Sequence, residues 1–549
     1  MKNLAWLGAV GVFISCLSFL SCTSDGPPKD LKAQADSRAA VPFAASMSYD
    51  DLLRLFKEWR EFQKPKSVGG VPDYTPAAMN EQRAGLELFK ARLKAIDPAS
   101  WPIQQRVDYM IVRAEMNGLE FDHRVMRPWS RDPGFYAVIN FEFAPHMFGS
   151  LDIPSLPLAE KDISEFRMKL RAIPKILEQA RSNLTEEAKD LWALGLRVKK
   201  RESEILADLA RNLAKHQPTL VPEADLAKQA VDDFKVWLEK KQVGMTAASG
   251  IGIDNYNWYM KNVLLLPYTW QELMALEGRE LQRATAFLKI EENRNRSLPQ
   301  LKPIVDDEEF RRRFDAASRY LMEFMRREKI MTVPAWLHVG AFDGKSVAAS
   351  GALDFFTRVE YMDPQPLRCH GTHTMDELRE ARNTHPIRGV PRLYFIDGTR
   401  AEGLAVGNEE MMLQAGLFDK NSRTRELVYI LLANRAARGV GDLRMHSNDF
   451  TLEQAVEFAA AWTPRGWMPK DGDTIWFDEQ LYLRTPGYGM GYVVGKIQLE
   501  KLMADRARQL GDQFVLKNFM DDFIASGMIP IALTRWEMTG LEDEIKKLW

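Results

Sequence analysis

Two histidines and several acidic residues concentrate between residues 369 and 410, and their spacing suits metal chemistry. His370 and His373 are three apart, so a helix would place both imidazoles on one face. Glu402 and Glu409 are seven apart, which is two helical turns, so they also share a face. Two histidines and one carboxylate are typical protein ligands of a catalytic zinc site, which keeps a position for water. The two histidines with one of the nearby carboxylates Glu402, Glu409 or Glu410 could therefore hold zinc, although surface or hydrogen-bonded core histidines are commoner than a metal-binding pair.

The motifs of several common enzyme classes are absent from the sequence. It contains no HExxH, GxSxG or CxxC motif and no Walker loop. The segment GYVVGK at residues 491–496 lacks the spacing and the hydroxyl residue of a phosphate-binding loop. Any zinc chemistry at the histidine pair would therefore use a non-standard site.

The elements that must position these residues are predicted to be helices. Apolar residues recur at helical spacing, with charged residues on the opposite face, and Ser48 is a suitable cap for the first helix. Such patterns cover residues 52–62, 79–96, 104–119 and 163–216. Pro174 should interrupt or kink the last of these stretches. Capping boxes mark two further helix starts: Thr269 with Glu272, and Thr451 with Gln454.

Signals for a β-sheet are weak by comparison. Only short β-prone pieces occur, such as Arg392–Ile396 and Thr474–Phe477, without an alternating series. We therefore predict an all-α fold with little or no sheet. Glycines near residue 245 suggest a soft boundary between an N-terminal helical half, residues 46–245, and a C-terminal helical half, residues 246–549. The two halves are expected to lie around a cleft and to share one core.

The first residues are typical of a bacterial lipoprotein signal. Lys2 precedes an apolar run, Leu4–Leu20, which ends at Ser21 and Cys22. We predict a signal peptide at residues 1–22, a lipid on Cys22 and a flexible tether at residues 23–45. An uncleaved anchor is the alternative. No aspartate follows Cys22 directly, which favours the outer membrane, facing the periplasm.

Charge and cysteine content exclude other classes. The 549 residues include 74 basic and 76 acidic ones, with a net charge of −2 and no basic block, which argues against a nucleic-acid partner. After processing, Cys369 would be the only free thiol, so no intramolecular disulfide is expected. The membrane is expected to be contacted through the lipid alone.

Several segments together resemble the bacterial family called domain of unknown function 885. Residues 400–410, RAEGLAVGNEE, followed by GLF at 416–418, are similar to the EGWALYAE…MGLY helix of that family. Residues 486–495, PGYGMGYVVG, resemble its PGQALSYKIG segment. Tyr268 and the five residues after it resemble its YTxEEL element. Over residues 250–540 the resemblance implies a mostly helical protein related to zinc metallopeptidases.

The resemblance also implies a ligand set, from which this chain departs. The family holds its metal with an HExxPGHH motif and the glutamate of EGWA, which correspond here to His370 and Glu402. The next residue should be the glutamate that polarises water, but it is Gly371, and no PGHH follows. A missing general base costs about 10²–10⁴-fold in rate. Glu377, Asp376 and Glu409 are the alternatives for that role.

Three further residues are candidates for contacts with substrate. His385 is an alternative metal ligand or a substrate contact, unless it only caps its own loop. Arg400 is a second candidate contact, unless it pairs with a neighbouring carboxylate. Tyr492 could donate a hydrogen bond to a developing oxyanion, or be a core aromatic residue.

Two functions follow from these patterns. The first is an exported metal-dependent hydrolase, most plausibly a peptidase or amidase, that acts on a peptide or another small substrate. In this hypothesis, which the resemblance supports, His370, His373 and Glu402 hold zinc, and the acid/base residue is non-standard. The second is a catalytically inactive lipoprotein that keeps the metallopeptidase-like cleft and binds a peptide or another ligand. A scaffold role in the envelope would require exposed patches of Trp and Met, which are more often buried.

Overall fold

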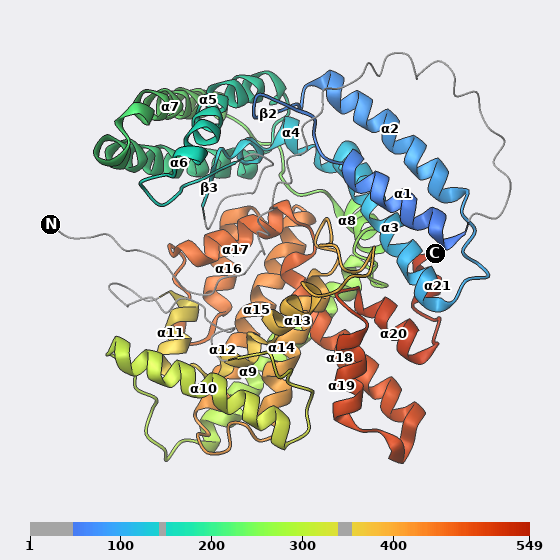
Figure 1. The fold of residues 1–549 in the computed structure, drawn as a ribbon. Coiled ribbons are helices and arrows are strands. Elements are labelled where there is room, and N and C mark those ends of the chain that lie inside the picture. Colours follow the sequence, from blue (N-terminus) through green and yellow to red (C-terminus); the bar gives the residue numbers. More distant parts are fainter. Residues whose placement is uncertain (1–47, 142–149, 339–353) are drawn as a thin grey trace.

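The computed structural model describes residues 48–141, 150–338 and 354–549, and within these ranges the chain is almost entirely helical (Figure 1). The strands found there form two small ladders: β1 (Ser67–Val68) with β2 (Val71–Pro72), antiparallel, and β3 (Ile139–Asn140) with β4 (Leu151–Asp152), parallel. The all-α prediction is therefore confirmed. The predicted signal peptide, the lipidated Cys22 and the tether to residue 45 lie outside the described residues.

Three N-terminal helices form one layer: α1 (Tyr49–Phe62), α2 (Pro76–Lys94) and α3 (Ile103–Phe121). Ser48 caps α1 in a capping box, and the predicted apolar face, including Leu52, Phe56 and Trp59, is buried. The layer shares a hydrophobic cluster with helices that come much later in the chain. These are α8 (Ile253–Asn262), α20 (Ile531–Thr539) and α21 (Ile545–Leu548), which are drawn near α3 in Figure 1.

A second group of helices occupies the upper left of Figure 1: α5 (Glu160–Asn183), α6 (Lys189–His216) and α7 (Val221–Lys241). Of the two predicted effects of Pro174, an interruption or a kink, the interruption is wrong, because α5 continues through this residue. Ile173, Ile176 and Leu177 beside it are buried, and this packing offsets the hydrogen bond that proline cannot donate. The chain breaks instead at residues 184–188, between α5 and α6.

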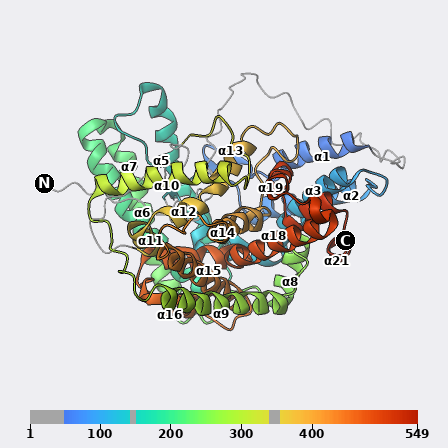
Figure 2. The same ribbon diagram turned by 90° about the horizontal axis from the view of Figure 1, so that it is seen from below.

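The candidate ligands depend on a core of four long helices: α9 (Trp270–Arg294), α14 (Gly398–Gln414), α15 (Thr424–His446) and α18 (Tyr488–Leu510). Figure 2 shows α15 between α9 and α14, and nearly every residue of α15 is buried. Helices α14 and α18 cross so closely that a Cβ atom on Gly403 would lie 2.4 Å from Cα of Gly495. The glycines of the 487–495 segment therefore include one that permits close helix packing, as the sequence suggested.

The remaining helices complete the body. They are α4 (Pro128–Arg131), α10 (Asp307–Arg327), α11 (Phe355–Met362), α12 (Gln365–His370), α13 (Thr372–Glu380), α16 (Leu452–Trp462), α17 (Asp473–Arg484) and α19 (Leu516–Ala525). The expected capping boxes at Thr269 and Thr451 are confirmed at the starts of α9 and α16. The β-prone piece Thr474–Phe477 lies within α17, and Arg392–Ile396 forms no strand, because tertiary packing overrides local β-propensity.

The two predicted halves are extensively joined. The largest hydrophobic cluster takes residues from α5, α6 and α7 as well as from α14 and α15. The second cluster likewise draws on helices from both sides of residue 245. None of the helices in the described part of the chain combines the length and apolar character needed to cross a bilayer.

Candidate metal centre

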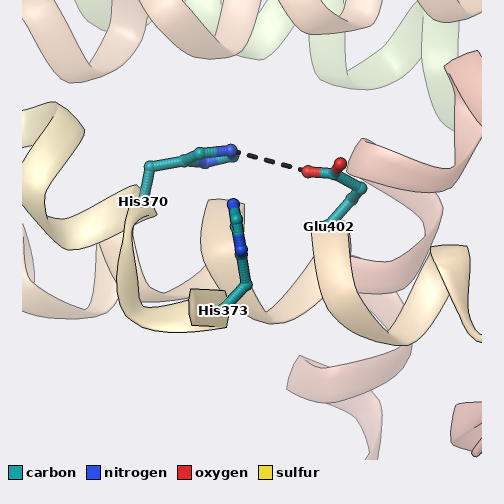
Figure 3. A group of neighbouring side chains, drawn as sticks. All are labelled: His370, His373 and Glu402. Atoms are coloured by element: carbon teal, nitrogen blue, oxygen red, sulfur yellow. Dashed lines mark ion pairs between the residues drawn. The ribbon is translucent and has the colours of Figure 1, made fainter. Parts of the chain in front are cut away.

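Three predicted ligands converge where α12, α13 and α14 meet (Figure 3). His370 is the last residue of α12, and His373 lies in the first turn of α13, with Gly371 between the two helices. The predicted single helical face is thus wrong, since the chain turns at Gly371. The rings nevertheless meet edge to face, with centroids 5.2 Å apart and planes at 89°. Glu402 faces them from α14, which the sequence did predict as a helix.

The distances suit a metal of zinc size. One nitrogen of each histidine and one oxygen of Glu402 all lie within 4.8 Å of one another. His370 Nε2 lies 3.5 Å from Glu402 Oε2. Two ligands of tetrahedral zinc, each about 2.0–2.2 Å from the ion, would lie about 3.3–3.6 Å apart. The His370–Glu402 pair therefore already has the spacing that a shared ion requires.

Each candidate ligand has an outer partner on an atom away from this convergence point. His370 Nδ1 lies 3.0 Å from Glu409 Oε1, without a hydrogen bond between these two atoms, and accepts a hydrogen bond of 3.2 Å from Arg435 Nη2. His373 Nδ1 lies 3.4 Å from Glu377 Oε1, although not in good hydrogen-bond alignment. Glu402 Oε1 accepts a hydrogen bond of 2.8 Å from the hydroxyl of Tyr488. Carboxylates behind histidines and donors behind carboxylates are the usual outer partners of metal ligands.

The site is nearly closed to solvent and carries negative charge. The exposed fractions of the side chains are 11% for His370, 12% for His373 and 8% for Glu402. Burial by itself would raise the pKa of Glu402, but His370, His373 and Tyr488 lower this pKa to about 2. Burial would likewise lower the pKa of His373, but Glu377 and Glu402 raise it. Glu402 is therefore an ionised carboxylate, which is the form that binds metal.

The residues present fit a divalent cation. Glu402 Oε2 is buried and has no hydrogen-bond partner among the described residues. A buried carboxylate oxygen without a hydrogen bond is costly, and a cation beside it would remove that cost. Two imidazoles and one carboxylate are the donor set of known catalytic zinc sites. The donor set, the spacing and the unpaired oxygen thus agree.

The alternatives for a general base lie in different surroundings. Glu409 is 1% exposed and is held by Arg435, whose Nη1 donates to Oε2 at 2.8 Å. Asp376 is 4% exposed and pairs with Arg400 at 2.8 Å. Glu377 is 29% exposed, and its Oε1 lies 3.4 Å from His373 Nδ1. Of these three carboxylates, Glu377 alone has substantial access to solvent.

Two predicted substrate contacts are not brought into the group. Arg400 is fully buried, pairs with Asp376 and packs over the ring of Phe523. His385 Nδ1 accepts hydrogen bonds from the backbone N–H groups of Ile387 and Arg388. Both residues therefore follow the structural alternatives considered for them: Arg400 pairs with a carboxylate, and His385 caps its own loop.

Tyrosines of α18 form one wall of the site. Tyr492 is the predicted oxyanion donor, and its ring lies 6.4 Å from the ring of His370, centroid to centroid. Tyr488, one turn earlier, is the residue that contacts Glu402, and the sequence analysis did not single it out. Asp442 holds this end of α18, because its carboxylate accepts hydrogen bonds from the N–H groups of Gly487 and Met490. Arg435 was also missed, and no sequence signal marks it.

The fold and the site together define a large helical protein with a candidate metal centre of two histidines and a glutamate. The chain belongs to the family of bacterial proteins of unknown function DUF885, whose model matches residues 63–323 and 375–538. Glu402, Glu409 and Tyr492 lie within the matched residues, whereas His370 and His373 lie between the two matched segments.

Solved structures with the same fold are also known. A protein called a putative lipoprotein of unknown function, from Shewanella oneidensis, is 16% identical, with a TM-score of 0.67 over 90% of this chain and 100% of that one. A protein called a putative lipoprotein, from Colwellia psychrerythraea, is 13% identical, with a TM-score of 0.65 over 90% of this chain and 99% of that one. At these identities the likeness concerns the fold. No curated protein matches the chain.

Proposed function

We propose that this protein is an exported, lipid-anchored, metal-dependent hydrolase that acts on peptide or amide bonds. The observation that carries the proposal is the convergence of His370, His373 and Glu402, each with an outer partner. These three residues would hold zinc. A zinc ion bound there would polarise a carbonyl group and lower the pKa of a bound water.

The chain's own residues would then have separate tasks. Glu377 would be the proton acceptor, because Glu409 and Asp376 are nearly fully buried and paired with arginines. To reach a water bound among the three ligands, its carboxylate would have to turn away from His373 Nδ1. Tyr492 would donate its hydroxyl hydrogen to the oxygen that becomes negative. Tyr488 would hold Glu402 in place through Oε1, leaving Oε2 for the ion.

Export and lipidation belong to the same proposal. Support comes from the Leu4–Leu20 run before Cys22 and from a fold shared with two proteins called lipoproteins. The absence of aspartate directly after Cys22 favours the outer membrane, facing the periplasm. Labelling of cells with radioactive palmitate tests this: the wild type should carry label, the variant Cys22→Ser should not, and fractionation locates the labelled protein. Label that persists in the variant would contradict lipidation at Cys22.

One experiment decides between the enzyme and its alternative. The protein is purified without chelators, its metal is measured by elemental analysis, and a peptide library is tested for cleavage, beside a His370→Ala, His373→Ala double variant and Glu377→Gln. We expect about one zinc per chain and cleavage in the wild type, neither in the double variant, and zinc without efficient cleavage in Glu377→Gln. A Glu377→Gln variant that cleaves at the wild-type rate would remove Glu377 from this role.

The second candidate function is a ligand-binding lipoprotein without catalysis. Gly371, at the position where the family resemblance implies a glutamate, favours it, as does the low exposure of all three ligands. Zinc without cleavage of any peptide in the wild type would support this candidate. A wild type that takes up no metal, even when zinc is added, would overturn the hydrolase.

A further inference from the structure

The turn that joins α12 to α13 is tied down by a buried side-chain hydroxyl. Thr372 is the first residue of α13, and its Oγ1 donates to the carbonyl oxygen of Cys369 in α12 at 2.7 Å. Only His370 and Gly371 lie between these two residues in the chain. Thr372 and Cys369 are both buried. The hydroxyl therefore closes a short ring of backbone that contains His370, the last residue of α12.

Asn408 of α14 holds the same hydroxyl from the other side. Its Nδ2 donates to Thr372 Oγ1 at 2.6 Å, and Asn408 is fully buried. A hydroxyl has one proton, which here goes to Cys369, so the group facing its oxygen must be a donor, as the amide N–H₂ is. The Oδ1 atom of Asn408 has no hydrogen-bond partner among the described residues, which is costly in a buried position. Asn408 is therefore poorly suited to packing alone, and the contact with Thr372 gives its amide a role.

We propose that Asn408 and Thr372 are positioning residues that hold the two histidines in a fixed place relative to Glu402. Asn408 and Glu402 lie six residues apart on the same helix, α14. The helix that provides the carboxylate ligand thus also holds the turn between the two imidazole ligands. The inference rests on the proposed metal centre and adds two residues to it that the sequence analysis did not single out.

The turn needs such support because the helices on either side of it are short. Helix α12 has six residues and α13 has nine, so neither is stable without contacts to the rest of the molecule. A metal ion binds well when its ligands are already held near the geometry that it requires, since any freedom they have is lost on binding. Two buried hydrogen bonds on Thr372 remove this freedom from the backbone between the histidines. They would therefore favour zinc binding without a contact to the ion itself.

A second pair of residues has the same bonding pattern and provides a matched control. Asn434 Nδ2 donates to Thr463 Oγ1 at 2.9 Å, and this hydroxyl donates to the carbonyl oxygen of Ala459 at 2.8 Å. Asn434 and Thr463 are also buried. Thr463 follows the last residue of α16, a helix that carries none of the three ligands. The variants Thr372→Val and Thr463→Val therefore each remove one buried hydroxyl with the same two bonds, and only Thr372→Val frees the turn between the histidines.

The test measures zinc affinity by competition with a chelator, using the zinc ion alone as the probe on the full chain. We expect Thr372→Val to bind zinc about tenfold more weakly than the wild type, a loss typical of groups that orient metal ligands. Thr372→Ser keeps the hydroxyl and should restore the wild-type affinity. Thr463→Val should change the affinity by less than about threefold, because sites without shared partners act independently. Unchanged affinity in Thr372→Val, equal losses in both valine variants, or no rescue by serine would overturn the proposal.

A double variant keeps the test decisive if Thr372→Val does not fold. That single change leaves Asn408 Nδ2 buried without an acceptor, whereas Thr372→Val together with Asn408→Leu removes both partners and avoids this cost. We expect the double variant to unfold at a higher urea concentration than the single one and still to bind zinc about tenfold more weakly than the wild type. Wild-type zinc affinity in the folded double variant would overturn the proposal.

A second measurement reports the geometry of the ligands. Cobalt(II) binds the same classes of ligand as zinc, and its visible absorption depends on the coordination geometry. We expect a changed absorption spectrum in Thr372→Val and the wild-type spectrum in Thr463→Val. Identical spectra in all three proteins would overturn the proposal. These readouts do not involve cleavage, so a wild type that binds zinc but cleaves no peptide would overturn the proposed hydrolase and leave this inference standing.

Discussion

His373 and His385 lie close together in the chain, yet the structure uses their ring nitrogens in opposite ways. His373 belongs to a group in which nitrogens and a carboxylate oxygen converge within 4.8 Å. At His385, Nδ1 already accepts two backbone hydrogen bonds, and Nε2 faces the Tyr49 hydroxyl at 3.4 Å and Asp108 at 3.7 Å. The comparison teaches that a histidine near acidic residues is a candidate ligand only if one nitrogen remains unused.

The surroundings of His385 form a structural network. Arg388 pairs with Asp108 at 2.7 Å and with Glu537 at 2.5 Å, and thereby joins the loop after α13 to α3 and α20. Tyr49 of α1 donates to Asp108 at 2.7 Å. This network fastens the segment between His373 and Glu402 to the N-terminal layer, whereas the triad is available for a ligand.

The largest expected effect is a difference in zinc content between variants of His373 and His385. We expect His373→Ala to lower the zinc content from about one per chain to none, because it removes one of three ligands. His385→Ala should keep full zinc content, because His385 is not part of the converging group. Elemental analysis of the two purified variants measures both. Zinc lost equally from both would mean that the distinction drawn from their hydrogen bonds is wrong.

The next largest effect concerns the stability of the network around His385. Arg388→Met leaves Asp108 and Glu537 buried without their cation, and breaking such pairs typically costs about 3–5 kcal/mol. Arg382→Met, in an exposed arginine of the same region, should change stability by no more than about 0.5 kcal/mol. Urea unfolding measures both. A small change in Arg388→Met would show that the network does not anchor this loop.

Local sequence signals predicted the helices, and the family resemblance predicted that His370 and Glu402 act as ligands of one metal ion. The Ser48 cap and the capping boxes at Thr269 and Thr451 depend on residues three positions apart, so they could be predicted from the sequence. Arg435 and Tyr488 contact residues 65 and 86 positions away, respectively. Those contacts depend on how α15 and α18 cross α14, which periodicity does not determine.

The histidine and proline errors have equally physical reasons. The sequence left His385 open between a ligand or substrate contact and a cap of its own loop, because the loop conformation that turns two N–H groups onto its Nδ1 is not visible in the sequence. The turn at Gly371 separates two histidines whose spacing suited one helix. Pro174 remained within α5 because the buried side chains around it outweigh one missing hydrogen bond.

A third histidine sharpens the comparison through pH. His446 is fully buried, and its Nε2 lies 3.1 Å from the carbonyl oxygen of Tyr482. Burial lowers the pKa of His446 to about 4, whereas the carboxylates around His373 raise the pKa of that residue. Below the unfolded pKa of about 6.5, His446 takes up a proton in the unfolded chain but stays neutral in the folded one until the pH approaches 4. The contribution of neutral His446 to the free energy of unfolding is therefore present above pH 6.5 and is lost as the pH falls towards 4.

The expected loss from His446 is about 3 kcal/mol between pH 7 and pH 4. The variant His446→Gln cannot titrate, so the difference in unfolding free energy between wild type and variant should shrink by this amount as the pH falls. Urea unfolding at several pH values measures the difference, and other titrating groups cancel in it. A difference that stays constant with pH would mean that His446 titrates alike in the folded and unfolded chain.

The smallest effect tests the outer partner of Glu402. Tyr488→Phe removes the hydroxyl that donates to Oε1 and frees this oxygen to rotate, which should weaken zinc binding by about tenfold. Tyr492→Phe is the matched change one turn later on α18. It should leave zinc affinity unchanged, because the hydrogen bond to Glu402 Oε1 comes from Tyr488. Competition with a chelator measures both affinities. If the two variants bind zinc alike, Tyr488 does not orient Glu402. The outer partners that distinguish the three ligands from the His385 network would then be only the two carboxylates beside the histidines.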